Sequence, residues 1–426
     1  MIGLAFSMTP ISGASNCLRS RKTSQPNATR GLSRIVVIGE NTKIVEVREM
    51  RDLPTEKAMI KVTGAIPWAK PDLAGNEQKY VSEAVASTWI SDGPFVERFE
   101  REFSGYCGSR YAMTASNGTT ALHMAFLALG VGPGDEVILP GFAFMAAANV
   151  ALHLGAKPVF TEVDPLTWCM NANEVEKHIS SKTKVIVPVH TYGNMCAMSE
   201  IMELANSKSI PVVEDAAEAF ASRHNNRHAG TIGAMGTFSF HATKTITTGE
   251  GGMVVTQSQQ FFDRMYLFRN HGMLRTRYWH ELHGHNFRLT NIQAGLGCAQ
   301  LERIDRIIAE RKRIYASYQR YLSNASGITM QFFAADVEPV VWSVALKLDA
   351  RAYPQGRNEV MRQLQETQIE TRNGFYAASL LQHLYACPKL SICEDLSEQV
   401  ISLPTYCALE DCDIHYICST LESLRK

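Results

Sequence analysis

Lys244 occupies a position in this chain that suggests chemistry. It lies in the stretch FSFHATKTITTGEGG (238–252), after an alternating aromatic segment and before a turn rich in Thr and Gly. Alternation points Ser239 away from Phe238 and Phe240, and the glycines allow the backbone to approach a bound group closely. A lysine in such a place is either a surface charge or a partly desolvated amine that serves as a nucleophile.

Three further stretches offer groups that could bind one ligand together with this lysine. Residues 116–120 (SNGTT) precede an apolar-faced segment, and the free backbone N–H groups of a helix N-terminus attract phosphate, although these residue types are also ordinary N-caps. Glu214 and Asp215 end an apolar strand, where a carboxylate can bind a metal, a ribose hydroxyl or a protonated ring nitrogen, or cap a helix. Phe144 follows another strand and is either a stacking surface or ordinary core.

Together these groups match one cofactor better than any of them does alone. A phosphate cradle, an aromatic plate, a carboxylate for a pyridinium nitrogen and a lysine for a Schiff base are what pyridoxal phosphate requires. The distance along the chain from Asp215 to Lys244 suits one loop and one strand between two neighbouring strand ends. The sequence therefore predicts a pyridoxal phosphate site.

The elements that must position these residues follow an alternating pattern. Strands are expected at 136–140, 157–163, 184–190, 210–216, 237–242 and 251–256, with helices between them and before them. Such alternation predicts βαβ units and a mostly parallel sheet, and ligands bind beyond the carboxyl ends of its strands. One long helix is expected over 291–322. We predict an N-terminal extension (1–60, with two short strands at 34–50), a large cofactor-binding domain (61–310) and a smaller α+β domain (311–426).

Bulk composition narrows the class of protein. Lys+Arg and Asp+Glu number 42 each, which argues against nucleic-acid binding through bulk charge, and no apolar run is long enough for a membrane-spanning helix. The ten cysteines are scattered, as in a cytoplasmic enzyme with reduced thiols. Cys412, His415 and Cys418 have helical spacing, and we interpret them as one helix face and predict no metal site. The acid-poor leader before Glu40 is either an organelle-targeting peptide or, as we favour, an N-terminal extension.

Six motifs have the order and spacing of one known family. They are NGTTALHMAFLALGVGPGDEVILP (117–140), VPVHTYG (187–193), EDAAEA (214–219), GTFSFHATKTITTGEGG (236–252), FRNHGM (268–273) and NFRLTNIQAGLGCAQL (286–301). From about residue 65 onward the chain closely resembles the nucleotide-sugar aminotransferase (DegT/StrS) family. The resemblance implies fold type I of the pyridoxal phosphate enzymes, which is aspartate aminotransferase-like with a seven-stranded, mostly parallel sheet flanked by helices. It also implies a homodimer with active sites at the subunit interface.

The resemblance assigns roles to individual residues. It implies that Lys244 forms the Schiff base with the cofactor, that Asp215 pairs with the pyridinium nitrogen and that Phe144 stacks on the ring. Glu218 stands near the cofactor's ring hydroxyl, where the family usually has Gln or His, so a carboxylate there must share or hold a proton. The phosphate is held by Gly118, Thr119 and Ser239, and Asn286 reaches the phosphate of the partner subunit.

The implied reaction is transamination. Glutamate would give its amino group to a keto-sugar attached to a nucleotide, and IETRNGFYAASL (369–380), which is similar to a substrate-facing segment of perosamine synthases, suggests a 4-keto-6-deoxy sugar. Two alternatives are a dehydratase or other lyase and a non-catalytic regulator on the same fold. Sugar dehydratases of this family carry His in place of the lysine, and a binding-only protein needs no such lysine, so Lys244 argues against both.

Overall fold

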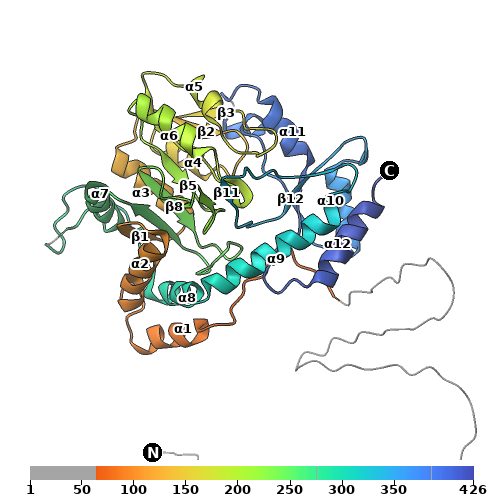
Figure 1. The fold of residues 1–426 in the computed structure, drawn as a ribbon. Coiled ribbons are helices and arrows are strands. Elements are labelled where there is room, and N and C mark those ends of the chain that lie inside the picture. Colours follow the sequence, from red (N-terminus) through yellow and green to blue (C-terminus); the bar gives the residue numbers. More distant parts are fainter. Residues whose placement is uncertain (1–63, 275, 385) are drawn as a thin grey trace, which may run out of the picture. The chain divides into compact units, whose positions relative to one another are not determined.

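The computed structural model describes residues 64–274, 276–384 and 386–426, and residues 64–426 form one compact unit (Figure 1). The predicted N-terminal extension, with its strands at 34–50, lies outside the described residues. In the described part of the chain, no helix combines the length and the apolar character needed to cross a membrane.

Seven strands form the main sheet in the order β3-β2-β4-β5-β8-β9-β1. Parallel bridges from Ile186 to Val212 and from Val189 to Asp215 join β4 to β5, and β9 is antiparallel to both of its neighbours. The strands are β1 (Tyr111–Ala115), β2 (Glu136–Pro140), β3 (Lys157–Thr161), β4 (Thr183–Ile186), β5 (Val213–Asp215), β8 (Met235–Ser239) and β9 (Gly252–Thr256). The prediction of a mostly parallel, seven-stranded sheet is confirmed.

Helices cover both faces of this sheet, so most of its strand residues are buried whichever face they point to. One buried cluster includes α3, α4 and Met265 of α7, and the other includes α2, α6 and α8. These helices are α2 (Pro94–Cys107), α3 (Gly118–Leu129), α4 (Ala146–His153), α6 (Met198–Ser207), α7 (Gln259–Arg269) and α8 (Asn291–Leu301). The shorter α1 (Glu77–Ala86) packs on α8, and α5 (Ala172–Glu176) packs on α6.

A second, antiparallel sheet has the strand order β10-β12-β14-β13. Its strands are β10 (Ile328–Met330), β12 (Ala345–Leu348), β13 (Arg372–Asn373) and β14 (Val400–Ser402). Helices α9 (Ile304–Leu322), α10 (Arg357–Glu366), α11 (Ser391–Gln399) and α12 (Asp411–Ser423) belong to the same part of the chain. The content is the α+β mixture expected there, and the domain boundaries at 61, 310 and 311 stay predictions. A small hairpin, β6 (Arg223–His224) and β7 (Arg227–His228), pairs with β11 (Val337–Glu338).

The expected long helix over 291–322 is wrong in one respect, because the structure divides it into α8 and α9. At the break, Glu302 accepts hydrogen bonds from Tyr80, Asn76 and Arg98, and Arg303 pairs with Asp72 at 2.8 Å. Side chains distant in the sequence hold these two residues, so local helical periodicity could not reveal the break.

Candidate functional site

Lys244 lies in the turn that links β8 to β9, at the carboxyl end of β8. Its backbone N–H donates to the carbonyl of His241 at 2.9 Å, and Thr248 N–H donates to the carbonyl of Phe240 at 2.9 Å, so the turn is tied to itself. The Lys244 side chain is only 14% exposed, and its Nζ lies 3.4 Å from Oε1 of Glu218. The structure therefore places the amine inside the protein beside a carboxylate, which excludes the surface-charge interpretation.

Asp215 and Glu218 bring two buried carboxyl groups to the same place. Asp215 ends β5, next to Thr237 of β8, and accepts a hydrogen bond from Ala217 N–H at 3.1 Å. Glu218 accepts one from the backbone N–H of Tyr192 at 2.9 Å. Burial raises the pKa of both carboxyl groups above their ordinary values, and attraction to the Lys244 ammonium opposes this shift without cancelling it.

The predicted phosphate cradle forms where α3 begins beside the end of β8. Asn117 caps the helix by accepting from Thr120 N–H at 2.9 Å, and Gly118 and the exposed Thr119 follow it. A Cβ on Gly118 would lie 2.8 Å from Cβ of Ser239, so only glycine lets the serine approach this closely. A helix N-terminus with a hydroxyl beside it suits a phosphate group.

Phe144 belongs to a set of aromatic rings that leads to the lysine. It is 64% exposed and meets Phe375 edge to face at 6.4 Å. Phe375 stacks on Tyr192 at 5.1 Å, and Tyr192 in turn bonds Glu218 through its backbone N–H. Trp342 lies beneath the amine, with its ring centroid 3.7 Å from Lys244 Nζ. Sequence reasoning did not assign a role to Tyr192, Trp342 or Phe375, although the quoted motifs VPVHTYG (187–193) and IETRNGFYAASL (369–380) contain Tyr192 and Phe375.

Asn286 is also a predicted site residue. Within the part of the chain that the structure describes, it makes no hydrogen bond or ring contact with the residues around Lys244. It is exposed and pairs with Asn270 in an antiparallel bridge, while its neighbour Phe287 accepts from Ser116 N–H at 2.8 Å. Its expected role lies in the partner subunit's site and stays a prediction.

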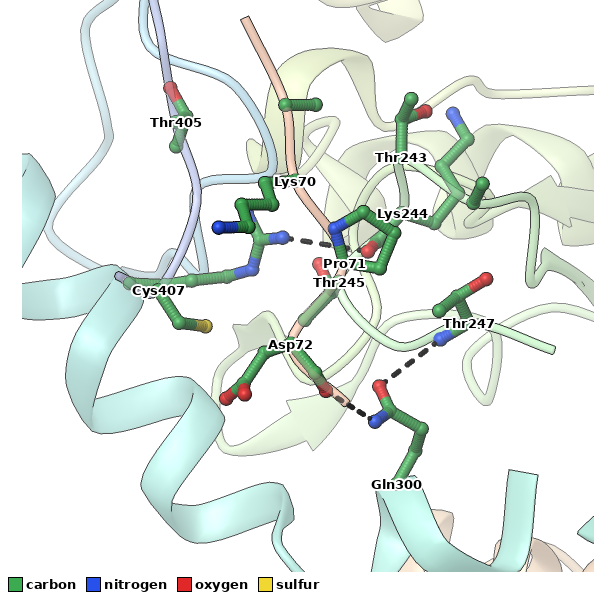
Figure 2. Close-up of a pocket in the computed structure, with 13 residues that line it drawn as sticks. Lys70, Pro71, Asp72, Thr243, Lys244, Thr245, Thr247, Gln300, Thr405 and Cys407 are labelled. Atoms are coloured by element: carbon green, nitrogen blue, oxygen red, sulfur yellow. Dashed lines mark hydrogen bonds between the residues drawn. The ribbon is translucent and has the colours of Figure 1, made fainter. Parts of the chain in front are cut away.

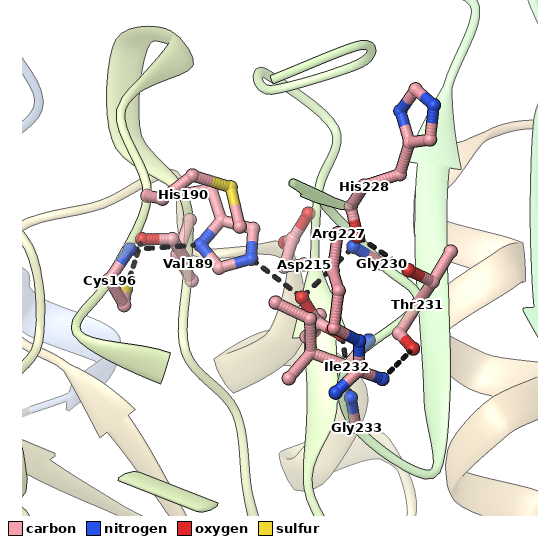
Figure 3. A network of polar contacts seen from close by, with 12 residues as sticks. Val189, His190, Cys196, Asp215, Arg227, His228, Gly230, Thr231, Ile232 and Gly233 are labelled. Atoms are coloured by element: carbon pink, nitrogen blue, oxygen red, sulfur yellow. Dashed lines mark hydrogen bonds and ion pairs between the residues drawn. The ribbon is translucent and has the colours of Figure 1, made fainter. Parts of the chain in front are cut away.

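Glu214 forms a separate buried network with His190 and with the turn at Gly230, Ile232 and Gly233, the four partners that Figure 3 labels. Its Oε1 accepts from the backbone N–H groups of Ile232 and Gly233 at 2.6 and 2.7 Å, and its Oε2 accepts from Gly230 N–H at 2.9 Å. His190 completes the set: its Nδ1 accepts from Cys196 N–H at 3.2 Å, so its Nε2 carries the hydrogen that is donated to Glu214 at 3.0 Å. This carboxylate holds a turn and has no acceptor position left for a ligand.

A cavity of about 10 Å³ lies behind the lysine turn (Figure 2). Its volume is that of roughly one water molecule, and the Lys244 side chain extends away from Asp72 and Gln300 on its wall. The cavity is therefore a gap among the residues that support the turn, and it is too small for a cofactor. Among the residues that the structure describes, no group of three or more His, Cys, Asp or Glu side chains could hold a metal ion.

The side chains fit pyridoxal phosphate. An amine, a carboxylate for a ring nitrogen and a glycine-hydroxyl cradle lie at the carboxyl ends of β8, β5 and β1, which belong to the same sheet, and α/β sheets bind ligands at this edge. The tight Gly118–Ser239 approach and the buried, incompletely bonded carboxylates are the observations that support this fit.

Comparisons with known proteins agree with this geometry. The sequence profile of the DegT/DnrJ/EryC1/StrS aminotransferase family matches residues 71–422. The GDP-perosamine synthase of Escherichia coli O157:H7 is 40% identical over 359 residues, covering 84% of this chain and 97% of that protein. The GDP-perosamine synthase of Caulobacter vibrioides is 39% identical over 362 residues, with 84% and 97% covered. The crystal structure of DesV from S. venezuelae, in complex with a ketimine intermediate, has a TM-score of 0.79 at 30% identity, covering 85% of this chain and 98% of that chain.

Proposed function

This chain belongs to the DegT/DnrJ/EryC1/StrS aminotransferase family, and we propose from that premise that it transfers the amino group of glutamate to a nucleotide-linked 4-keto-6-deoxy sugar. The enzyme class itself, a pyridoxal phosphate-dependent sugar aminotransferase, follows from the family and its relatives. The observation that carries the proposal is the buried Lys244 amine, 3.4 Å from Glu218 and at the carboxyl end of the strand beside Asp215.

Pyridoxal phosphate, when bound, supplies an electron sink for breaking the bond to the hydrogen of the amino-bearing carbon. Lys244 would present its amine to the cofactor aldehyde, and its Nζ would take up and return a proton. Asp215 would keep a proton on the ring nitrogen by opposite charge. Glu218 holds or shares a proton beside the ring hydroxyl, where its own Oε1 already faces Lys244.

The remaining predicted residues orient the cofactor. Gly118, Thr119 and Ser239 hold the phosphate through the N-terminus of α3 and a hydroxyl, and Phe144 covers one face of the ring. Asn286 completes the phosphate site of the partner subunit in a homodimer. A GDP-linked sugar is the first acceptor to test, because the relatives named above are GDP-perosamine synthases.

The decisive experiment supplies the purified enzyme with pyridoxal phosphate, glutamate and a panel of GDP-, UDP- and dTDP-linked 3-keto and 4-keto sugars. We expect an amino sugar and an equal amount of 2-oxoglutarate with a 4-keto-6-deoxy sugar, detected by mass spectrometry and a coupled assay. Lys244→Ala is the matched control and should give neither product. Elimination without transfer of nitrogen, or no amino sugar from any acceptor while the cofactor remains bound, would overturn the proposal.

A further inference from the structure

Trp342 is the residue closest to the catalytic amine that the family motifs do not include. It lies in the segment before β12, far along the chain from the strands that build the site. Its indole ring is buried, with 7% of the residue exposed, and Lys244 Nζ sits over the ring face at 3.7 Å from its centroid. This distance is well inside the range in which a cation is attracted to an indole face.

Hydrogen bonds fix the indole to the turn that carries the lysine. Trp342 Nε1–H donates to the carbonyl of Thr243, the residue before Lys244, at 2.6 Å. The Arg311 guanidinium donates to the carbonyl of Trp342 at 2.8 Å and to that of Lys244 at 3.4 Å. The indole is thus bonded directly to the turn that carries the lysine, and Arg311 links the backbones of Trp342 and Lys244.

Aromatic neighbours hold the ring from its edge and its face. Trp68 meets it edge-on at 5.8 Å with the ring planes at 90°, and Tyr192 is nearly parallel to it at 6.3 Å and 13°. The backbone N–H of Trp342 also donates to the carbonyl of Tyr192 at 3.1 Å. An indole held on several sides cannot move away without breaking these contacts.

Three groups near the Lys244 amine attract a positive charge, and Arg311 opposes them. The negative face of an indole attracts an ammonium and has little attraction for a neutral amine, and Glu218 at 3.4 Å has the same preference. Asp215 adds a second carboxylate close enough to be affected by the lysine charge. Arg311 opposes them, but its guanidinium contacts the lysine carbonyl and not Nζ.

From this geometry we infer that Trp342 is a positioning residue that forms the resting site of the Lys244 ammonium whenever the lysine is not bonded to the cofactor. The indole face holds the ammonium that forms when Nζ takes up the substrate proton and keeps it aimed at the carboxylates, so the same proton can be returned. The role in the reaction rests on the proposed function, because transamination releases the lysine in each half-reaction. The resting site itself does not depend on which substrate reacts.

The test replaces Trp342 with tryptophan analogues that carry one, two or three ring fluorines. Fluorination weakens the negative ring face and leaves the shape and the Nε1–H in place, so the protein keeps its fold. The full-length, cofactor-free protein is labelled with trace acetic anhydride at one fixed pH, and the peptide that contains Lys244 is quantified by mass spectrometry. Because a weaker attraction to the indole face leaves the amine freer to react, we expect the labelling rate of Lys244 to rise stepwise, by roughly 3- to 10-fold with three fluorines.

Trp68 provides the matched control, because it packs on Trp342 but the lysine does not sit on its ring. The same analogues at position 68 should leave the labelling rate of Lys244 unchanged, and Trp342→Phe, which keeps a weaker aromatic face, should give a partial rise. A labelling rate that is unchanged by fluorination of Trp342, or changed equally from position 68, would overturn the inference. Because the labelling uses neither cofactor nor substrate, its result is separate from success or failure of the sugar assay.

Discussion

Glu214 and Asp215 are neighbours on β5, yet their carboxylates serve different ends because strand alternation sends them to opposite faces of the sheet. Glu214 is fully buried and accepts hydrogen bonds from His190 and from the backbone of Gly230, Ile232 and Gly233. Asp215 is almost as buried, but among the described residues only the backbone N–H of Ala217 donates to it.

The difference separates a structural carboxylate from one that awaits a ligand. A buried charge is tolerated when donors surround it, and Glu214 meets that condition within the protein. Asp215 does not meet it, and burial raises the pKa of its carboxyl group. A positively charged ring nitrogen would supply the missing hydrogen-bond donor and the missing opposite charge. We therefore expect the motif EDAAEA to combine a residue that holds the fold with one that serves the reaction.

Asp215→Asn gives the largest expected effect. The amide cannot hold a proton on the ring nitrogen by charge, so the rate of transamination should fall by about 10³-fold, while the free energy of unfolding is not reduced. Steady-state kinetics at saturating cofactor and urea denaturation measure the two quantities. A fall in the transamination rate of less than about tenfold would mean that Asp215 has a structural role, as Glu214 does.

Glu214→Gln should show the opposite pattern. The amide NH₂ would face backbone N–H groups that now donate to a carboxylate, so the free energy of unfolding should fall by roughly 3 kcal/mol. Urea denaturation of the cofactor-free protein measures this loss, and the folded variant should keep its cofactor absorbance. Unchanged stability together with lost cofactor binding would reverse the assignments of the two residues.

Gly230→Ala tests the turn that donates hydrogen bonds to Glu214, and it should have a smaller effect on the free energy of unfolding. Gly230 has φ +82° and an added Cβ would lie 2.5 Å from the Phe238 ring, so backbone strain and crowding together should cost about 2 kcal/mol. Gly249 shares the same φ but has no atom within 4 Å of an added Cβ. Gly249→Ala is thus the matched control and should cost about 1 kcal/mol of backbone strain alone. Equal losses in the two variants would remove the packing argument.

The smallest expected effect is a change with pH in the stability difference between the native chain and Asp215→Asn. The pKa of Asp215 is raised in the folded state, so its contribution to stability is fully present below the unfolded pKa and is lost as the pH rises through the folded pKa. Asp215→Asn should therefore gain stability relative to the native chain as the pH rises from about 4 toward neutrality. Melting temperatures of both cofactor-free proteins over this range test the sign, and a difference that is constant with pH would refute it.

The sequence predicted the parts of the site that are local. Lys244, Asp215 and the Gly118 helix start lie in short motifs at strand ends, and strand alternation with helices predicted the sheet that brings them together. The residues that contact Lys244 Nζ include one from outside those motifs. Trp342 comes from a distant segment, just before β12 begins at Ala345, and no motif of the site includes it.

Long-range packing accounts for features of the structure that local sequence patterns did not reveal. Tyr192 is buried with a left-handed φ of +59°, a conformation that no residue pattern indicates for a tyrosine. The break before Arg303 depends on side chains more than two hundred residues earlier. Asn286 acquires its expected role only when a second copy of the chain is present.

The central claim is that the Lys244 amine is the group that bonds to the cofactor, and one measurement tests it directly. The enzyme is incubated with pyridoxal phosphate, reduced with borohydride and digested, and the phosphopyridoxyl adduct is mapped by mass spectrometry. We predict bleaching of the yellow absorbance and a single adduct on the peptide that contains Lys244, with no adduct in Lys244→Ala. An adduct on another lysine, or a yellow, reducible band that persists in Lys244→Ala, would contradict the account.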